Sequence, residues 1–185
     1  MITTTRYPSN NPTTIGRDKD RDTPSNFELS NVVVSQASIV LPFSPRTAYF
    51  AFSNFSRHSE WNPQLTKVEY VDGSRNEARW TMESYGIKFG WSTVPVRQEP
   101  NKLLVWRSVK GLQLQGRAEF EEYEEGQTRM LFTMCYVAQR KVKSSSFAGP
   151  SKRESAQLRM MLESFRDAVS KELKSEKSQE EESAE

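Results

Sequence analysis

Residues 112–120 alternate strictly between two kinds of side chain, and this pattern constrains the fold more than any other part of the sequence. The odd positions are polar or charged, and the even positions are apolar or small: Leu112, Leu114, Gly116, Ala118 and Phe120. A period of two residues is typical of a β-strand with one covered and one wet face. Apolar runs at 103–106 and 130–137 flank it, with a turn at 125–127. We therefore predict an antiparallel hairpin that lines an apolar interior.

The two ends of the chain differ in composition from its middle. Hydrophobic residues make up 35% of the 185, and mean hydropathy is -0.75. Residues 1–27 show no apolar periodicity, and residues 176–185 contain five Glu against one Lys. Such segments bury too little apolar surface to offset their ordering entropy. We expect a disordered segment over 1–27, one domain over 28–174 and a disordered acidic tail over 175–185.

Sequence signals for location and cofactor chemistry are few. The sequence holds no run of 18 apolar residues and no secretory signal, so we expect a soluble, intracellular protein. The first 17 residues contain Arg6, Arg17 and no acid, as transit peptides do, but they lack amphipathicity; a plastid or mitochondrial address is therefore the weaker alternative. One Cys and one His cannot assemble a metal site alone. Nucleotide-binding and hydrolase motifs are absent, and we expect neither metal nor cofactor.

The remaining chain divides into strands and helices at clear boundaries. Strand patterns occupy 32–41, 65–71, 78–83 and 89–96, and Pro95 in the last of them suggests an edge or a bulge. Ser44 and Pro45 predict the start of a short helix, and a second helical turn ends before Pro63. An amphipathic pattern predicts a long helix over 151–174. The expected class is α+β: six or seven antiparallel strands, two short helices after the first strand, and a long C-terminal helix across the sheet.

This order of elements resembles the START-like superfamily, also called Bet v 1-like, helix-grip or SRPBCC, and within it the polyketide cyclase/dehydrase and coenzyme Q-binding branch. The resemblance covers roughly residues 31–173 and is carried by residues 39–45, Trp61-Asn62-Pro63, Trp80, Trp106-Arg107-Ser108 with Gly111 and Gly116, and Phe120 with Gly126-Gln127-Thr128. It implies a curved sheet around the last helix, with a cavity for a lipid, an isoprenoid quinone or a polyketide-like ligand.

Large apolar side chains on the covered faces are the candidate cavity lining. They are Trp61, Trp80, Met82, Phe89, Trp91, Trp106, Leu112, Leu114, Phe120, Phe132, Met134, Tyr136, Met161 and Phe165. For each of them, plain core packing is the alternative, because protein interiors are normally filled. Three of the tryptophans bring an indole N–H that needs a partner when buried, and a pocket with a few polar points would accommodate it.

Candidate catalytic groups are sparse. His58 lies close to Glu60 and Trp61 and is the only histidine, but on a short polar helix we expect it to be exposed. Tyr85, Tyr136, Arg79 and Arg107 could orient a carbonyl or an enol, provided that they point into the cavity.

Basic residues flank the loop before the last helix, and no acid interrupts them between 138 and 153. They are Arg140, Lys141, Lys143, Lys152 and Arg153, with Phe147 at the centre. A solvated loop is one interpretation, and a peripheral contact with anionic membrane is the other. A net charge of only +2 disfavours nucleic-acid binding.

Three classes of function remain open. Binding or transport of a hydrophobic small molecule ranks first and a cyclase/dehydratase-like enzyme second. A protein-interaction module ranks third, since the resemblance includes bacterial members that associate with ribosomes. A hollow interior separates the first class from the third, because a packed interior would leave no room for a ligand.

Overall fold

Seven strands, three α-helices and one 3-10 turn form the described part of the computed structural model, which comprises residues 32–71, 76–84, 86–137 and 152–183. In chain order they are β1 (Val32–Leu41), α1 (Pro45–Ser53), η2 (Phe55–Arg57), α2 (His58–Trp61), β2 (Leu65–Tyr70), β3 (Ala78–Ser84), β4 (Ile87–Glu99), β5 (Leu103–Lys110), β6 (Leu114–Glu122), β7 (Thr128–Val137) and α3 (Lys152–Ser183). The predicted α+β class and element order are confirmed.

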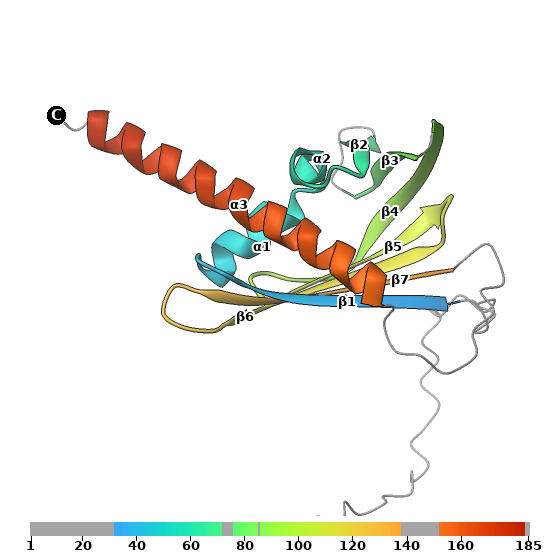
Figure 1. Ribbon diagram of the computed structural model, residues 1–185, viewed down its shortest axis with the longest axis horizontal. Coiled ribbons are helices and arrows are strands. Elements are labelled where there is room, and N and C mark those ends of the chain that lie inside the picture. Colours follow the sequence, from blue (N-terminus) through green and yellow to red (C-terminus); the bar gives the residue numbers. More distant parts are fainter. Residues whose placement is uncertain (1–31, 72–75, 85, 138–151, 184–185) are drawn as a thin grey trace, which may run out of the picture.

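The strands form one antiparallel sheet in the order β1-β7-β6-β5-β4-β3-β2. Each strand from β2 to β7 pairs with the next in sequence, and β1 closes the order by pairing with β7. The ladder between β4 and β5 shifts register at Pro95, which confirms the bulge that proline favours. Figure 1 shows the curved sheet with α3 running diagonally across it and α1 and α2 beside that helix.

The opening alternation corresponds to β6. Leu114, Gly116, Ala118 and Phe120 are buried, and the residues between them are exposed or half-buried. Gly116 faces Trp106 in the β5–β6 ladder, and a Cβ atom there would lie 2.2 Å from the indole ring. Glycine is therefore required at this position because the tryptophan ring occupies the space of a side chain.

The first short helix begins, and the second ends, where the sequence predicts. The Ser44 hydroxyl accepts a hydrogen bond from the Thr47 backbone N–H at 3.3 Å, and Pro45 opens α1. α2 ends at Trp61, and Asn62 after it is extended, as the following proline demands. Both helices place aromatic side chains against the sheet.

The long helix α3 extends further than predicted. The structure continues it to Ser183, so the prediction of a disordered tail is wrong for residues 175–183. Glu, Lys and Gln are good helix formers, and they propagate a helix that packing has already nucleated. The hydroxyls of Ser175 and Ser178 also hydrogen-bond to the carbonyls four residues earlier. None of the described helices is both long and apolar enough to cross a membrane.

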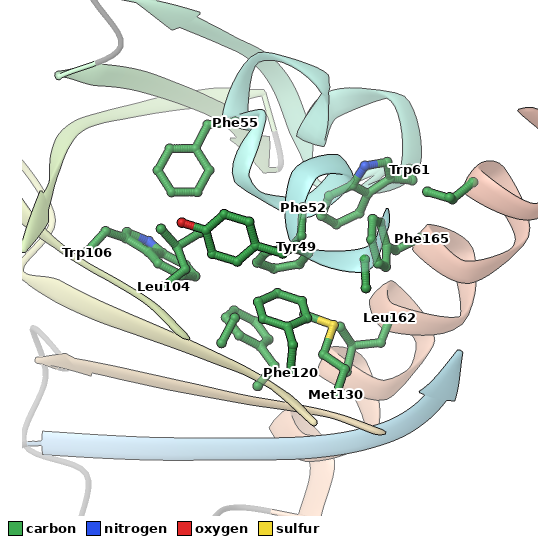
Figure 2. Packing of buried hydrophobic residues seen from close by; sticks show 14 of the residues in the cluster. Tyr49, Phe52, Phe55, Trp61, Leu104, Trp106, Phe120, Met130, Leu162 and Phe165 are labelled. Atoms are coloured by element: carbon green, nitrogen blue, oxygen red, sulfur yellow. The ribbon is translucent and has the colours of Figure 1, made fainter. Parts of the chain in front are cut away.

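The core is an aromatic cluster centred on Phe52 of α1. Its ring stacks on Trp61 of α2 at a centroid distance of 5.6 Å and meets Phe165 of α3 edge-on at 5.3 Å. Phe120 and Phe132 of the sheet contact the same ring at 6.1 and 5.6 Å. Figure 2 shows Phe52, Phe120 and Phe165 between the sheet, α1 and α3. This cluster fixes α3 on the sheet and closes one end of the interior.

Candidate functional site

The interior is not filled throughout: it contains an open pocket of about 580 Å³. β1 and β3–β7 contribute wall residues from the inner face of the sheet, and α3 contributes residues between 157 and 164. The segment from α2 to the start of β2, Phe52 of α1 and Leu112 of the β5–β6 turn complete the lining. Most of the wall residues are aromatic or aliphatic. Gln64 and Gln157 are exposed, which places them at the opening of the pocket.

Ten of the fourteen predicted lining residues lie on this wall. They are Trp80, Met82, Trp91, Trp106, Leu112, Leu114, Phe132, Met134, Tyr136 and Met161. They come from β3, β4, β5, β6, β7, the β5–β6 turn and α3. Strand alternation and helix periodicity explain why they share one interior, and contact with a ligand stays a prediction for each.

The other four predicted residues lie elsewhere. Trp61, Phe120 and Phe165 are buried in the Phe52 cluster, where the interior is filled. Phe89 lies opposite Met82 in the β3–β4 ladder, on the inner face of the sheet, but its side chain is 46% exposed. Phe89 is therefore not on the wall of this pocket, and its contact with a ligand stays a prediction.

Several wall residues were not among the sequence candidates. They are Ser35, Phe52, His58, Asn62, Pro63, Gln64, Leu65, Gln157, Leu158, Met160 and Ser164. Leu158 precedes Met161 by three residues in α3, so helical periodicity could have identified it. Residues 62–64 form a connection between α2 and β2, whose position no local pattern reveals.

His58 is buried, not exposed as the sequence suggested, and it lies on the pocket wall. Only 4% of its surface is accessible, because the aromatic rings of Phe55, Trp61 and Trp80 enclose the imidazole. Its Nε2 lies 2.7 Å from the backbone carbonyl oxygen of Phe52. Burial lowers the pKa of His58 from 6.5 to about 3, and this hydrogen bond offsets only part of the effect. The imidazole is therefore neutral at physiological pH.

The pocket tryptophans differ in their hydrogen bonding. The Trp80 Nε1–H donates to the Thr93 hydroxyl at 2.7 Å, as a buried indole requires. Trp91 stacks parallel to Trp80 at a centroid distance of 6.2 Å, but its enclosed Nε1 has no hydrogen-bond partner among the described residues. One tryptophan is thus held by a side-chain hydrogen bond, and the other carries an unsatisfied donor.

The remaining catalytic candidates do not converge in the pocket. Tyr136 lines it, whereas Arg79 is exposed beside Trp80 and Arg107 lies beside Trp106, each on the opposite face of its strand. Tyr85 lies outside the described residues. No group of three His, Cys, Asp or Glu that could hold a metal occurs in the part of the chain that the structure describes.

The proposed membrane-contact residues are beyond what the structure describes. Residues 138–151, which include Arg140, Lys141, Lys143 and Phe147, lie outside the described ranges. Lys152 and Arg153 open α3, but their side chains are not described. The membrane contact therefore stays a prediction.

The sequence over residues 41–166 matches the family described as polyketide cyclase / dehydrase and lipid transport. No curated protein matches at a significant level. Among solved structures, a START superfamily protein from Mycobacterium smegmatis is 15% identical, with a TM-score of 0.59 over 76% of this chain and 98% of that one. A Deinococcus radiodurans protein is 20% identical, with a TM-score of 0.57 over 73% and 95%. The aromatase/cyclase Zhui from Streptomyces sp. R1128 is 13% identical, with a TM-score of 0.51 over 75% and 87%. At these identities the structures establish the helix-grip fold that the sequence predicts.

Proposed function

The chain belongs to the polyketide cyclase/dehydrase and lipid transport family, and we propose that it binds or transports a hydrophobic small molecule in the pocket described above. A lipid, an isoprenoid quinone or a polyketide-like molecule has the required character. If the chain belongs to the coenzyme Q-binding branch, its ligand would be the isoprenoid quinone. Membership of that branch is part of this proposal.

The observation that carries this proposal is the pocket itself. Protein interiors are close-packed, and voids larger than a water molecule are few. A space of about 580 Å³ with aromatic and aliphatic walls departs from that rule, and it falls within the ~300–1,000 Å³ of typical small-molecule sites. The same observation argues against a module that acts only through its outer surface, since such a module needs no hollow interior.

The polar groups of the pocket favour a carrier over an enzyme. A general base works best when its pKa lies near the operating pH. The pKa of His58, lowered to about 3, makes it a poor base at neutral pH. Arg79 and Arg107 lie on the other face of the sheet and cannot reach a bound carbonyl. A cyclase/dehydratase-like enzyme is the second candidate because Tyr136 lines the wall, and conversion of a poly-β-ketone substrate by the purified protein would identify it.

Two serines on α3 offer a matched test of the pocket. Ser164 and Ser175 are both exposed, and each donates its hydroxyl to the carbonyl four residues earlier. Only Ser164 lines the pocket. We expect Ser164→Trp to place an indole in the cavity and to weaken binding of the fluorescent probe anilinonaphthalene sulfonate by about tenfold, or ~1.4 kcal/mol. Ser175→Trp should bind the probe as the wild type does.

Native mass spectrometry of the same three proteins supplies a second readout. Wild type and Ser175→Trp should retain a copurified apolar molecule that Ser164→Trp lacks, and organic extraction would identify it. Equal probe binding and equal retention by all three proteins would contradict the assignment of the ligand site to this pocket.

A further inference from the structure

The orientation of the His58 ring in the pocket wall is tightly constrained. Phe52, Phe55, Trp61 and Trp80 surround it at centroid distances of 4.8, 5.2, 4.2 and 5.3 Å. Its Nε2 hydrogen-bonds to the Phe52 carbonyl oxygen. A ring held by four neighbours and one hydrogen bond presents its second nitrogen in a fixed direction.

The hydrogen bond also determines where the imidazole proton lies. A carbonyl oxygen can only accept, so Nε2 carries the proton and donates it to Phe52. In a neutral imidazole the other nitrogen, Nδ1, is then an acceptor. The buried ring therefore offers one lone pair to its surroundings.

Nothing in the described part of the chain satisfies that lone pair. The only hydrogen bond from the His58 ring within the described residues is the one to Phe52. Only Trp91 Nε1 and Asn101 Oδ1, among the described side chains, are both fully enclosed and unpaired. Because the His58 side chain lines the pocket and its Nε2 is bonded to Phe52, Nδ1 is the ring nitrogen left to pair with a molecule in the pocket.

Two other polar groups of the wall are already engaged. The Ser164 hydroxyl donates to the Met160 carbonyl, and Asn62 Oδ1 accepts from the Gln64 backbone N–H. His58 differs from them in being more than nine-tenths buried on a largely apolar wall, with no partner for its acceptor nitrogen among the described residues.

We infer that His58 Nδ1 accepts a hydrogen bond from a hydroxyl group on the ligand, so that the pocket prefers an apolar alcohol or phenol to the corresponding ketone or quinone. The inference rests on the proposed function and names the ligand class. A hydroxyl can donate to Nδ1, which relieves the cost of burying both groups. A carbonyl has only lone pairs, so it would leave Nδ1 unpaired and repel it. Sites built to pair with a hydroxyl reject analogues without one for this reason.

Menthol and menthone test this preference directly, because they share one carbon skeleton and differ only in a hydroxyl against a carbonyl. Isothermal titration calorimetry of the wild type should give about tenfold tighter binding of menthol, as a single net hydrogen bond allows. In His58→Phe the two probes should bind within about twofold of each other, because the acceptor is gone while the aromatic wall remains.

A structural control comes from Tyr70, which braces the same segment without lining the pocket. Its hydroxyl accepts from the Phe55 N–H at 2.9 Å and donates to the Ser53 carbonyl at 3.4 Å. Tyr70→Phe should lower stability and leave the ratio of the two dissociation constants unchanged. If Tyr70→Phe also lost the preference for menthol over menthone, that preference would depend on the rigidity of the segment and not on the His58 acceptor, and the inference would be overturned.

Nitrogen NMR of the wild type provides a readout that does not depend on any variant folding. The chain has one histidine, so the imidazole resonances need no further assignment. Menthol should shift the Nδ1 resonance toward the value of a hydrogen-bonded acceptor, with little change at Nε2, and menthone should not.

Equal binding of the two probes to the wild type, with no change at Nδ1, would overturn the inference and leave the proposed function standing. Failure of both probes to bind would count against the proposed function as well. The two failures are therefore distinguishable.

Discussion

The burial of His58 makes a definite prediction about stability and pH. The pKa of this histidine falls from 6.5 to about 3 on folding, chiefly because burial penalises the charged imidazolium. As pH drops below 6.5 the unfolded chain takes up a proton that the folded protein refuses until pH approaches 3. The contribution of a neutral buried His58 is therefore complete above the unfolded pKa and is lost as pH falls between these two values.

The magnitude follows from the two pKa values. The pKa of His58 in the unfolded chain, 6.5, lies about 1.5 units above a solution pH of 5. Each unit of that difference lowers the free energy of unfolding by ~1.4 kcal/mol. The wild type should lose about 2 kcal/mol of unfolding free energy between pH 7 and pH 5 from this group alone. That is a large share of the ~5–15 kcal/mol by which such domains are stable. The hydrogen bond from Arg117 lowers the pKa of Glu119 below its usual value of 4.5, so the stability that Glu119 contributes is lost at a lower pH than the range between pH 7 and pH 5.

Guanidinium unfolding at pH 7, 6 and 5, followed by tryptophan fluorescence, measures this loss. His58→Phe removes the titrating group, so its stability should change by about 2 kcal/mol less than that of the wild type over the same range. Tyr70→Phe keeps His58 and should show the full pH dependence at a lower overall stability. If wild type and His58→Phe lost stability in parallel, the burial of a neutral His58 would be refuted.

The stacked pair Trp80 and Trp91, and Gly116 beside Trp106, allow further tests by denaturant unfolding. Trp80→Phe deprives a buried hydroxyl of its donor and should cost about 1–2 kcal/mol more than Trp91→Phe, which removes a donor that is already unpaired; equal losses would contradict this difference. Gly116→Ala should cost about 1–3 kcal/mol because its methyl group would collide with the Trp106 ring. Gly90→Ala is the control, since a Cβ there meets only ordinary contacts, and equal stability of both alanine variants would show that the indole moves aside easily.

Much of the fold could be predicted because its elements carry local signals. The alternation around Gly116 marks a strand and both of its faces, and the Ser44–Pro45 pair marks the start of α1. The apolar series in α3 identifies Leu162, Phe165 and Val169 as the buried side of the helix. The end of α3 was not predictable in this way, since an exposed run of good helix formers has no apolar pattern.

The site was predictable only in part, because local sequence patterns identify the face of a strand or helix but not what packs against it. Inner-face residues such as Trp80 and Met134 could be recognised, but Phe120 lies on that face too and packs into the core. His58 sits on a short polar segment, and its burial depends on rings that come from α1, η2, α2 and β3. Three of these rings lie within six residues of His58, but their convergence on it depends on how α1, η2 and α2 fold against one another and against Trp80 of β3, which no local pattern reports.

The sequence by itself determined the element order, the faces of the strands and the apolar side of the long helix, because side-chain direction repeats with the local backbone period. The tertiary structure alone decided which inner-face side chains fill space and which surround it. That choice depends on the curvature of the sheet and the distance at which α3 crosses it, and the packing of Phe52 against Trp61 and Phe165 sets how closely α3 approaches. Where those rings meet, the interior is filled, and beyond Phe52, which lines the wall, the sheet and the helix leave the pocket.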